Sequence, residues 1–163
     1  MGKDTIEELF ELSISAEREA QAFYASLAEA YSAHDVAVRF FHDMHQDEER
    51  HIDVLTRMRG SLSKEDIKKP VPPHAASLIT AFLNFSAAES MAKTYDLEDA
   101  YRMVVNHEFS ELNKLHELLI DLFAPGEETR RKSFEMIKAH LRKIEAFHDA
   151  TGDTVARRGV LPS

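Results

Sequence analysis

Four amphipathic segments of this chain carry acidic and imidazole side chains at positions that the helical pattern assigns to the interior. In the second segment, Glu48 and His51 belong to a series with steps of three and four, as on the apolar face of a packed helix: Phe41, Met44, Glu48, His51, Leu55 and Met58. A buried carboxylate without a partner costs several kcal/mol, so an interior that holds several needs neutralising groups. Metal ions are the simplest such groups.

The other three segments repeat this pattern. Glu108 and Glu111 interrupt an apolar series formed by Tyr101, Val104, Leu115, Leu118 and Leu122. Glu17 shares a seven-residue spacing with Phe10, Tyr24 and Tyr31. His140 shares the steps of Ile137, Ile144 and Phe147. The pattern therefore predicts that four helices direct ionisable side chains into one core.

The composition predicts one compact unit and excludes several functions. The chain has 163 residues, 44% hydrophobic and 30% charged, as in a single domain over residues 1–163. Its net charge of -9 argues against nucleic acid, because such proteins display clustered Lys and Arg. The absence of cysteine excludes disulfides and thiolate-ligated metals. With no signal sequence visible and no stretch that could span a membrane, we expect a cytoplasmic protein without a membrane partner.

Local signals predict a first hairpin of two long helices. Thr5 and Glu8 match a capping box, which opens a helix that runs to about Tyr31. Ser32 with Asp35 is expected to cap the second helix, which carries Glu48 and His51 and stops near residue 60.

The rest of the chain predicts a crossover and a second hairpin. Three prolines, at positions 70, 72 and 73, exclude a continuous helix after residue 60, and a shorter connecting helix is expected over residues 74–91. Asp96 is expected to cap a third long helix through Leu122, and a fourth follows over residues 127–148. The tail over residues 152–163 is expected to be loosely ordered. Two antiparallel hairpins joined by a long crossover form an all-α four-helix bundle.

Four segments carry motifs that support a family resemblance. They read AEREAQAFYASLAEA (16–30), FFHDMHQDEERHIDVL (40–55), NHEFSELNKLHELL (106–119) and IKAHLRKIEAF (137–147). They resemble the helices of the ferritin-like di-iron carboxylate superfamily, and within it the rubrerythrin-like branch without a rubredoxin domain. The resemblance implies a ferritin-like four-helix bundle.

The resemblance also implies a metal site and its ligands: Glu17, Glu48, His51, Glu108, Glu111 and His140. Tyr24 is expected beside them as a hydrogen-bond donor to a ligand or to a bound oxygen species. The implied cofactor is iron, with two ions expected and one as the alternative, and the carboxylate and imidazole ligands also suit manganese or zinc. The chain departs from the family at Ile137, where a glutamate of the fourth helix is expected, and Glu111 could replace the lost oxygens.

Each of these residues also has a purely structural interpretation. Glu111 could turn toward solvent, and His140 could be a core histidine bonded to a carboxylate. The run from Asp47 to Arg50 is expected to be a solvated face apart from Glu48. Five other histidines are expected at the surface or near helix ends: His42, His45, His107, His116 and His148.

The implied function is that of a metal-binding oxidoreductase that acts on peroxide or dioxygen or handles ferrous iron. Since the chain has no cysteine to form a rubredoxin centre, electrons would come from a separate donor. A redox-inactive binding or assembly module and an iron-storage protein are the alternatives, and loss of the glutamate at Ile137 favours the former. We expect a homo-oligomer, with a dimer favoured over a cage.

Overall fold

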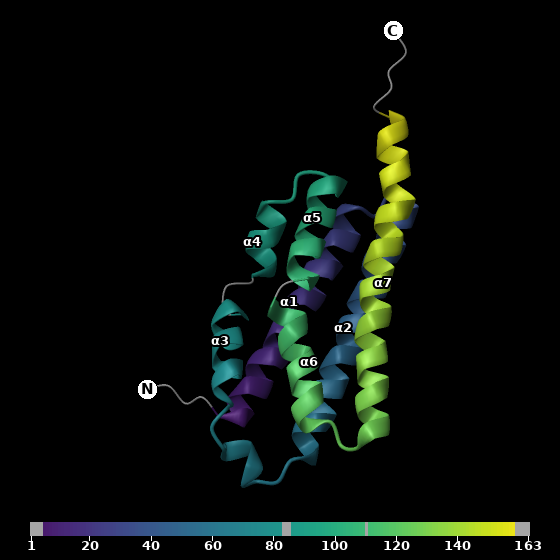
Figure 1. The fold of residues 1–163 in the computed structure, drawn as a ribbon. Coiled ribbons are helices and arrows are strands. Elements are labelled where there is room, and N and C mark those ends of the chain that lie inside the picture. The colour runs from purple at the N-terminus through teal and green to yellow at the C-terminus, as the bar shows by residue number, and fades with distance from the viewer. Residues whose placement is uncertain (1–4, 83–85, 110, 159–163) are drawn as a thin grey trace.

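The computed structural model describes residues 5–82, 86–109 and 111–158, without the side chains of 76, 79–82, 111, 112 and 152–158. The described chain is an all-α, ferritin-like helical bundle without a β-strand, as the sequence predicts. Figure 1 shows α1, α2, α7 and the successive helices α5 and α6 side by side, with α3 and α4 along one flank. Among the described residues, no helix combines the length and apolar character that a membrane span needs.

The first hairpin consists of α1 (Ile6–Ala30) and α2 (Asp35–Ser61), which pack along each other. The predicted capping box at Thr5 and Glu8 is confirmed, since each residue bonds to the backbone of the other. The cap of α2 was predicted wrongly, because His34, rather than Ser32, accepts a hydrogen bond from the backbone of Ala37.

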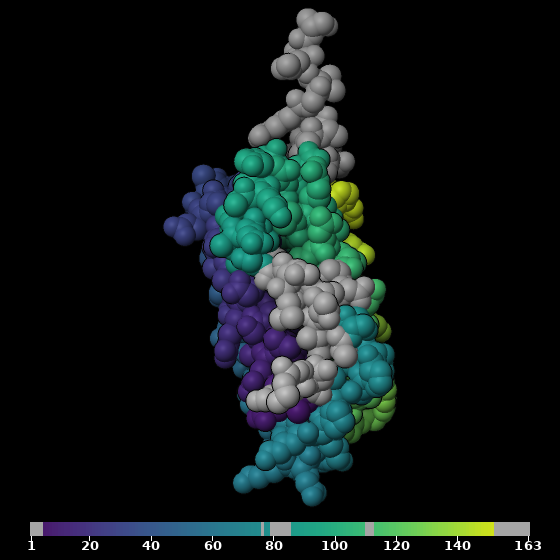
Figure 2. All heavy atoms as spheres, turned by 90° about the vertical axis from the view of Figure 1, so that its left-hand side faces the viewer, coloured from purple at the N-terminus to yellow at the C-terminus, as the bar shows by residue number. Residues whose placement is uncertain are grey.

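The crossover returns the chain to the opposite end of the bundle through short elements. These are a 3-10 turn η1 (Asp66–Lys68), α3 (Pro73–Phe82) and α4 (Ala87–Ala92), so two helices replace the single one expected over residues 74–91. A hydrogen bond of 3.0 Å from Ile6 N to Lys69 O ties the crossover to the start of α1. Figure 2 shows this flank, with the first part of the crossover near one end of the bundle, α4 near the other, and α1 visible between them.

The third long helix differs from the prediction because it is divided. Asp96 caps α5 (Leu97–Glu108) as predicted, but α5 ends at Glu108 and a separate helix, α6 (Glu111–Phe123), continues the chain. The break changes which residues of α6 face inward. Leu119 and Ile120 are buried, whereas Leu122, predicted inward, is 42% exposed.

The fourth long helix, α7 (Glu127–Arg158), is longer than predicted. It follows a turn in which Gly126 adopts a φ of 85°, a conformation that favours glycine. The helix continues through residues 149–158, so the expectation of a loosely ordered tail is wrong for residues 152–158, and residues 159–163 lie outside the described part of the chain. Figure 1 shows the end of α7 projecting beyond the other helices.

The bundle interior consists of two apolar clusters separated by a polar layer. One cluster includes Phe23, Phe41 and Phe147, and the other includes Phe10, Leu55 and Ile137. On α7, His140 lies between Ile137 of one cluster and Ile144 of the other. Along α1 and α2, the ionisable residues of the interior likewise lie between the two clusters. The fold therefore holds these side chains at mid-height, where packed apolar residues above and below exclude water.

Candidate metal centre

The polar layer contains six ionisable side chains from five helices, each no more than 2% exposed. They are Glu17 of α1, Glu48 and His51 of α2, Glu108 at the end of α5, His116 of α6 and His140 of α7. Helical spacing of three residues places Glu48 and His51 on one face of α2. The layer joins residues up to 123 positions apart in sequence (140 minus 17), so only the assembled bundle forms it.

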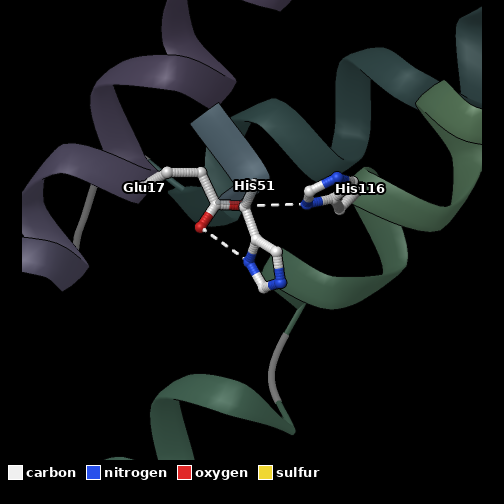
Figure 3. Close-up of side chains that lie close together, drawn as sticks. All are labelled: Glu17, His51 and His116. Atoms are coloured by element: carbon white, nitrogen blue, oxygen red, sulfur yellow. Dashed lines mark hydrogen bonds and ion pairs between the residues drawn. The ribbon is translucent and has the colours of Figure 1, made fainter. Parts of the chain in front are cut away.

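Glu17, His51 and His116 form the first of two candidate metal-binding groups, which we call the nitrogen-rich group. The Glu17 carboxylate lies between the two imidazoles, as Figure 3 shows. Its Oε1 is 2.9 Å from His116 Nδ1, and its Oε2 is 3.5 Å from His51 Nδ1. One oxygen ligand and two nitrogen ligands from three helices thus converge on one point.

Glu48, Glu108 and His140 form the second group, which we call the oxygen-rich group. His140 Nε2 lies 3.0 Å from Glu108 Oε2 and 3.4 Å from Glu48 Oε1. Here two carboxylates meet one imidazole. The group is as deeply buried as the first and comes from α2, α5 and α7.

Glu48 connects the two groups. Its Oε1 faces His140 at 3.4 Å, while its Oε2 lies 3.0 Å from His51 Nδ1 in the nitrogen-rich group. The rings of His51 and His140 are also neighbours, with centroids 4.8 Å apart. The two groups are therefore adjacent halves of one centre, and the Glu48 carboxylate has the arrangement of a bridging ligand.

The donor spacing fits metal ions. Two donors that each lie about 2.1 Å from one ion are about 3.0–3.4 Å apart for coordination angles near 90° to 109°. The contacts within the groups are 2.9 and 3.5 Å in one and 3.0 and 3.4 Å in the other. Within the described residues, four buried atoms of this layer also have no hydrogen-bond partner: Glu48 Oε1 and the Nε2 atoms of His51, His116 and His140. Unsatisfied buried polar atoms are costly, so Glu48 Oε1 and these Nε2 atoms are suited to a ligand, whereas Nδ1 of His51 and of His116 already has a carboxylate partner.

The carboxylates have strongly divergent affinities for protons. Burial, together with the negative charges of Glu108 and Glu17, raises the pKa of Glu48 well above its ordinary value. Burial acts in the same direction on Glu17, but hydrogen bonding to Glu48 and the proximity of His51 and His116 hold its pKa well below the ordinary value. Of these carboxyl groups, Glu48 therefore holds a proton more readily than usual, whereas the ionised form of Glu17 is favoured.

The histidines compensate the remaining negative charge. Burial opposes protonation of His140, but Glu108 and Asp47 outweigh it and raise its pKa to about 10. Burial also opposes protonation of His51, but the nearby Glu17 outweighs burial and raises the pKa of His51. Burial dominates at His116, whose pKa is lowered although it contacts Glu17. The carboxyl groups with lowered pKa values, Glu17 and Glu108, thus lie beside His51 and His140, the histidines with raised pKa values.

Tyr24 lies against the oxygen-rich group, where its hydroxyl donates a hydrogen bond to Glu108 Oε1. Its side chain is fully buried within the apolar cluster that contains Phe23. Burial and the charge of Glu108 raise the pKa of the phenol well above its ordinary value, so it remains a donor. The structure thus brings Tyr24 beside a candidate ligand.

Asp47 is a buried partner of the centre that the sequence interpretation assigned to a solvated face. It is 5% exposed, and its Oδ2 accepts hydrogen bonds from His140 Nδ1 at 3.2 Å and Lys143 Nζ at 2.7 Å. Burial raises its pKa, but these two partners lower it to about 2. A carboxylate on one ring nitrogen of a histidine fixes the ring and directs the other nitrogen, here Nε2, toward a metal.

The structure and the predicted site residues differ at α6. The side chain of Glu111 lies outside those that the structure describes, so its role stays a prediction. Ile137, at the position of the lost glutamate, is an apolar core residue. His116 was expected at the surface but is 1% exposed and occupies the nitrogen-rich group, and His107 is also buried rather than exposed. His42 and His148 are exposed as expected.

The helix break explains why His116 was missed. In an uninterrupted helix, the steps of three and four from Glu108 pass through Leu115 and leave His116 to one side. No proline or glycine marks the break between α5 and α6. The available signal was Ser110 followed by Glu111, a residue type favoured at N-caps followed by an acid of a first turn.

Comparison with known protein families agrees with the geometry. The family model described as Rubrerythrin matches residues 8–138, which is more than half of the chain and includes five of the six buried ligand candidates, all except His140. No curated protein and no solved structure matches the chain. The match includes α1, α2, α5 and α6, and the two buried carboxylate and histidine groups can bind metal ions. The chain therefore belongs to the rubrerythrin family, a ferritin-like di-iron family.

Proposed function

We propose that the protein holds two metal ions, with iron as the resident metal, and acts as an oxidoreductase on peroxide or dioxygen. The observation that carries the proposal is the pair of adjacent buried groups with Glu48 between them. Two neighbouring ferrous ions supply the two electrons that reduction of peroxide to water requires. Manganese or zinc is compatible with the same ligands.

The ligand set that we propose consists of Glu17, Glu48, His51, Glu108, His116 and His140. Glu111 is the alternative to His116 as the sixth ligand. Tyr24 would donate its hydroxyl proton in a hydrogen bond to Glu108 and keep this ligand oriented. Asp47 would orient His140 through Nδ1. The apolar clusters on both sides would keep bulk water from the reacting atoms.

Ferrous protein is expected to be oxidised rapidly by hydrogen peroxide, with about one peroxide consumed per two ferrous ions. The test is stopped-flow absorbance with anaerobically loaded protein. Tyr24→Phe should slow the oxidation or weaken iron binding by about 10- to 100-fold, the usual range for loss of a hydrogen bond to a ligand. Tyr31→Phe is the matched control, because Tyr31 is a partly buried tyrosine at the C-cap of α1, where it packs against the apolar cluster that contains Phe23.

The reaction of ferrous protein with hydrogen peroxide and with dioxygen also distinguishes the alternative functions. Iron that is oxidised by dioxygen and accumulates well beyond two ions per chain would indicate storage. Bound metal that reacts with neither oxidant would indicate a redox-inactive binding or assembly module, the interpretation that Ile137 favours.

Substitutions at His116 and Glu111 are expected to have different effects on metal stoichiometry. His116→Ala removes one of three donors of the nitrogen-rich group and should reduce bound metal from two ions per chain to one. Glu111→Ala should leave both ions in place if His116 supplies the sixth ligand. Elemental analysis of the two purified variants decides this. The reverse result, with one ion lost only in Glu111→Ala, would assign the role to Glu111.

The remaining parts of the functional hypothesis come from the sequence alone. They are a single domain over residues 1–163, a cytoplasmic location, a separate electron donor and a dimer rather than a cage. Size-exclusion chromatography with light scattering tests the last of these directly.

A further inference from the structure

The two halves of the centre offer different chemical donors. The nitrogen-rich group contains two imidazoles and the carboxylate of Glu17, whereas the oxygen-rich group contains one imidazole and two carboxylates. His116 creates this difference, because it adds an imidazole where the halves would otherwise each hold one histidine. The difference is therefore built into α6 of this chain.

We propose that the two metal positions are chemically unlike. The position formed by Glu17, His51 and His116 selects an ion that prefers nitrogen, such as Zn²⁺ or Co²⁺, more strongly than the position formed by Glu48, Glu108 and His140, which suits a harder ion such as Mn²⁺. This inference rests on the proposed function in one respect, namely that both groups bind metal.

The chemistry of the donors gives the direction of selectivity. Imidazole suits zinc, cobalt and iron, while carboxylate suits manganese, so the additional imidazole of His116 increases discrimination between Zn²⁺ and Mn²⁺. Every such site binds Zn²⁺ more tightly than Mn²⁺, and what differs is the ratio of the two affinities. We expect this ratio to be on the order of tenfold larger in the nitrogen-rich group.

The carboxylates alone do not distinguish the two groups, because Glu48 is shared between them. The oxygen-rich group has the charges of Glu108 and Glu48 at the ion, and Asp47 accepts a hydrogen bond from Nδ1 of its histidine. In the nitrogen-rich group, Glu17 is the one carboxylate besides the shared Glu48, and it already contacts both imidazoles. With Glu48 shared, each group has two carboxylates, so the difference between them is the additional imidazole of His116.

The test is displacement of Mn²⁺ by buffered Zn²⁺ in the intact protein, followed by the paramagnetic resonance signal of released Mn²⁺. We expect two phases of release, each of one Mn²⁺ per chain, separated by on the order of tenfold in free Zn²⁺. Release of both ions at one Zn²⁺ concentration would overturn the inference while leaving the proposed function intact. Failure to bind either ion would overturn both.

Two variants determine which group gives which phase. Glu108→Ala should retain the phase at low Zn²⁺, and His116→Ala should retain the phase at high Zn²⁺. His42→Ala is the matched control, an exposed histidine of α2, and it should retain both phases. Equal midpoints in Glu108→Ala and His116→Ala would show that the positions are alike and that two phases in the intact protein arise from repulsion between the ions. If an alanine variant does not fold, Glu108→Gln or His116→Gln, which preserve more of the side-chain volume, replaces it in the same titration.

Discussion

Glu48→Ala is expected to abolish binding of both metal ions. The two oxygens of Glu48 face different groups, with Oε1 3.4 Å from His140 Nε2 and Oε2 3.0 Å from His51 Nδ1. The substitution therefore removes one donor from each position and the negative charge between two cations. Elemental analysis after gel filtration should find metal reduced from two ions per chain to nearly none.

Glu49→Ala is the control for this experiment. Glu49 is the next residue of α2 but is exposed, and a solvated carboxylate contributes little to either stability or metal binding. This variant should keep both ions. If Glu48→Ala retained an ion at unchanged affinity, Glu48 would not bridge the two positions.

Removal of metal is expected to lower the melting temperature by about 15–30 °C. An ion that binds only the native state, at a free concentration about a thousandfold above its dissociation constant, adds about 4 kcal/mol of stability, and two ions add about twice that. In a chain of this size, 1 kcal/mol corresponds to about 2–4 °C. Calorimetry with and without chelator measures the difference, and Glu48→Ala, which should hold no metal, should not respond to chelator.

The effect of metal on stability is expected to increase with pH. In the metal-free protein the pKa of His140 is raised to about 10, so its stabilising contribution is present below about pH 6.5 and is lost as pH rises toward 10. The raised pKa of Glu48 acts in the same direction. Metal binding instead requires these groups to lose their protons, so the affinity for metal increases as pH rises.

The melting temperatures of the two forms should therefore diverge as pH is raised from about 6 to 8. The metal-free protein should become less stable, and the metal-loaded protein should not. Parallel curves over this range would show that metal binding does not displace protons from His140 and Glu48.

The helical bundle could be predicted because local signals and tertiary packing agree along most of the chain. The signals that define these helices are local, because each depends on residues only a few positions apart. They are the capping box at Thr5, the cap at Asp96 and the apolar periodicity through Phe41 and Leu55. The division between α5 and α6 could not be predicted, because neither proline nor glycine marks it. The cap of α2 was missed because His34 is not among the residue types that usually cap helices.

The candidate site could be predicted where an ionisable residue interrupts a regular apolar series. Glu17, Glu48, His51, Glu108 and His140 satisfy this condition, and the structure brings them into one buried layer. His116 and Asp47 do not satisfy it, since their burial depends on the helix break and on the approach of α7. His116 contacts Glu17, which is 99 residues away in sequence, and Asp47 contacts His140, which is 93 residues away. Helical periodicity cannot predict contacts between residues so far apart.

The central claim is that two metal ions lie in the polar layer of the bundle. The most direct test is an anomalous difference map, measured at the iron absorption edge on crystals of protein loaded anaerobically with ferrous iron. We expect two peaks, one among Glu17, His51 and His116 and the other among Glu48, Glu108 and His140, with Glu48 between them. A map without a peak in this layer, from protein that had been given iron, would contradict it.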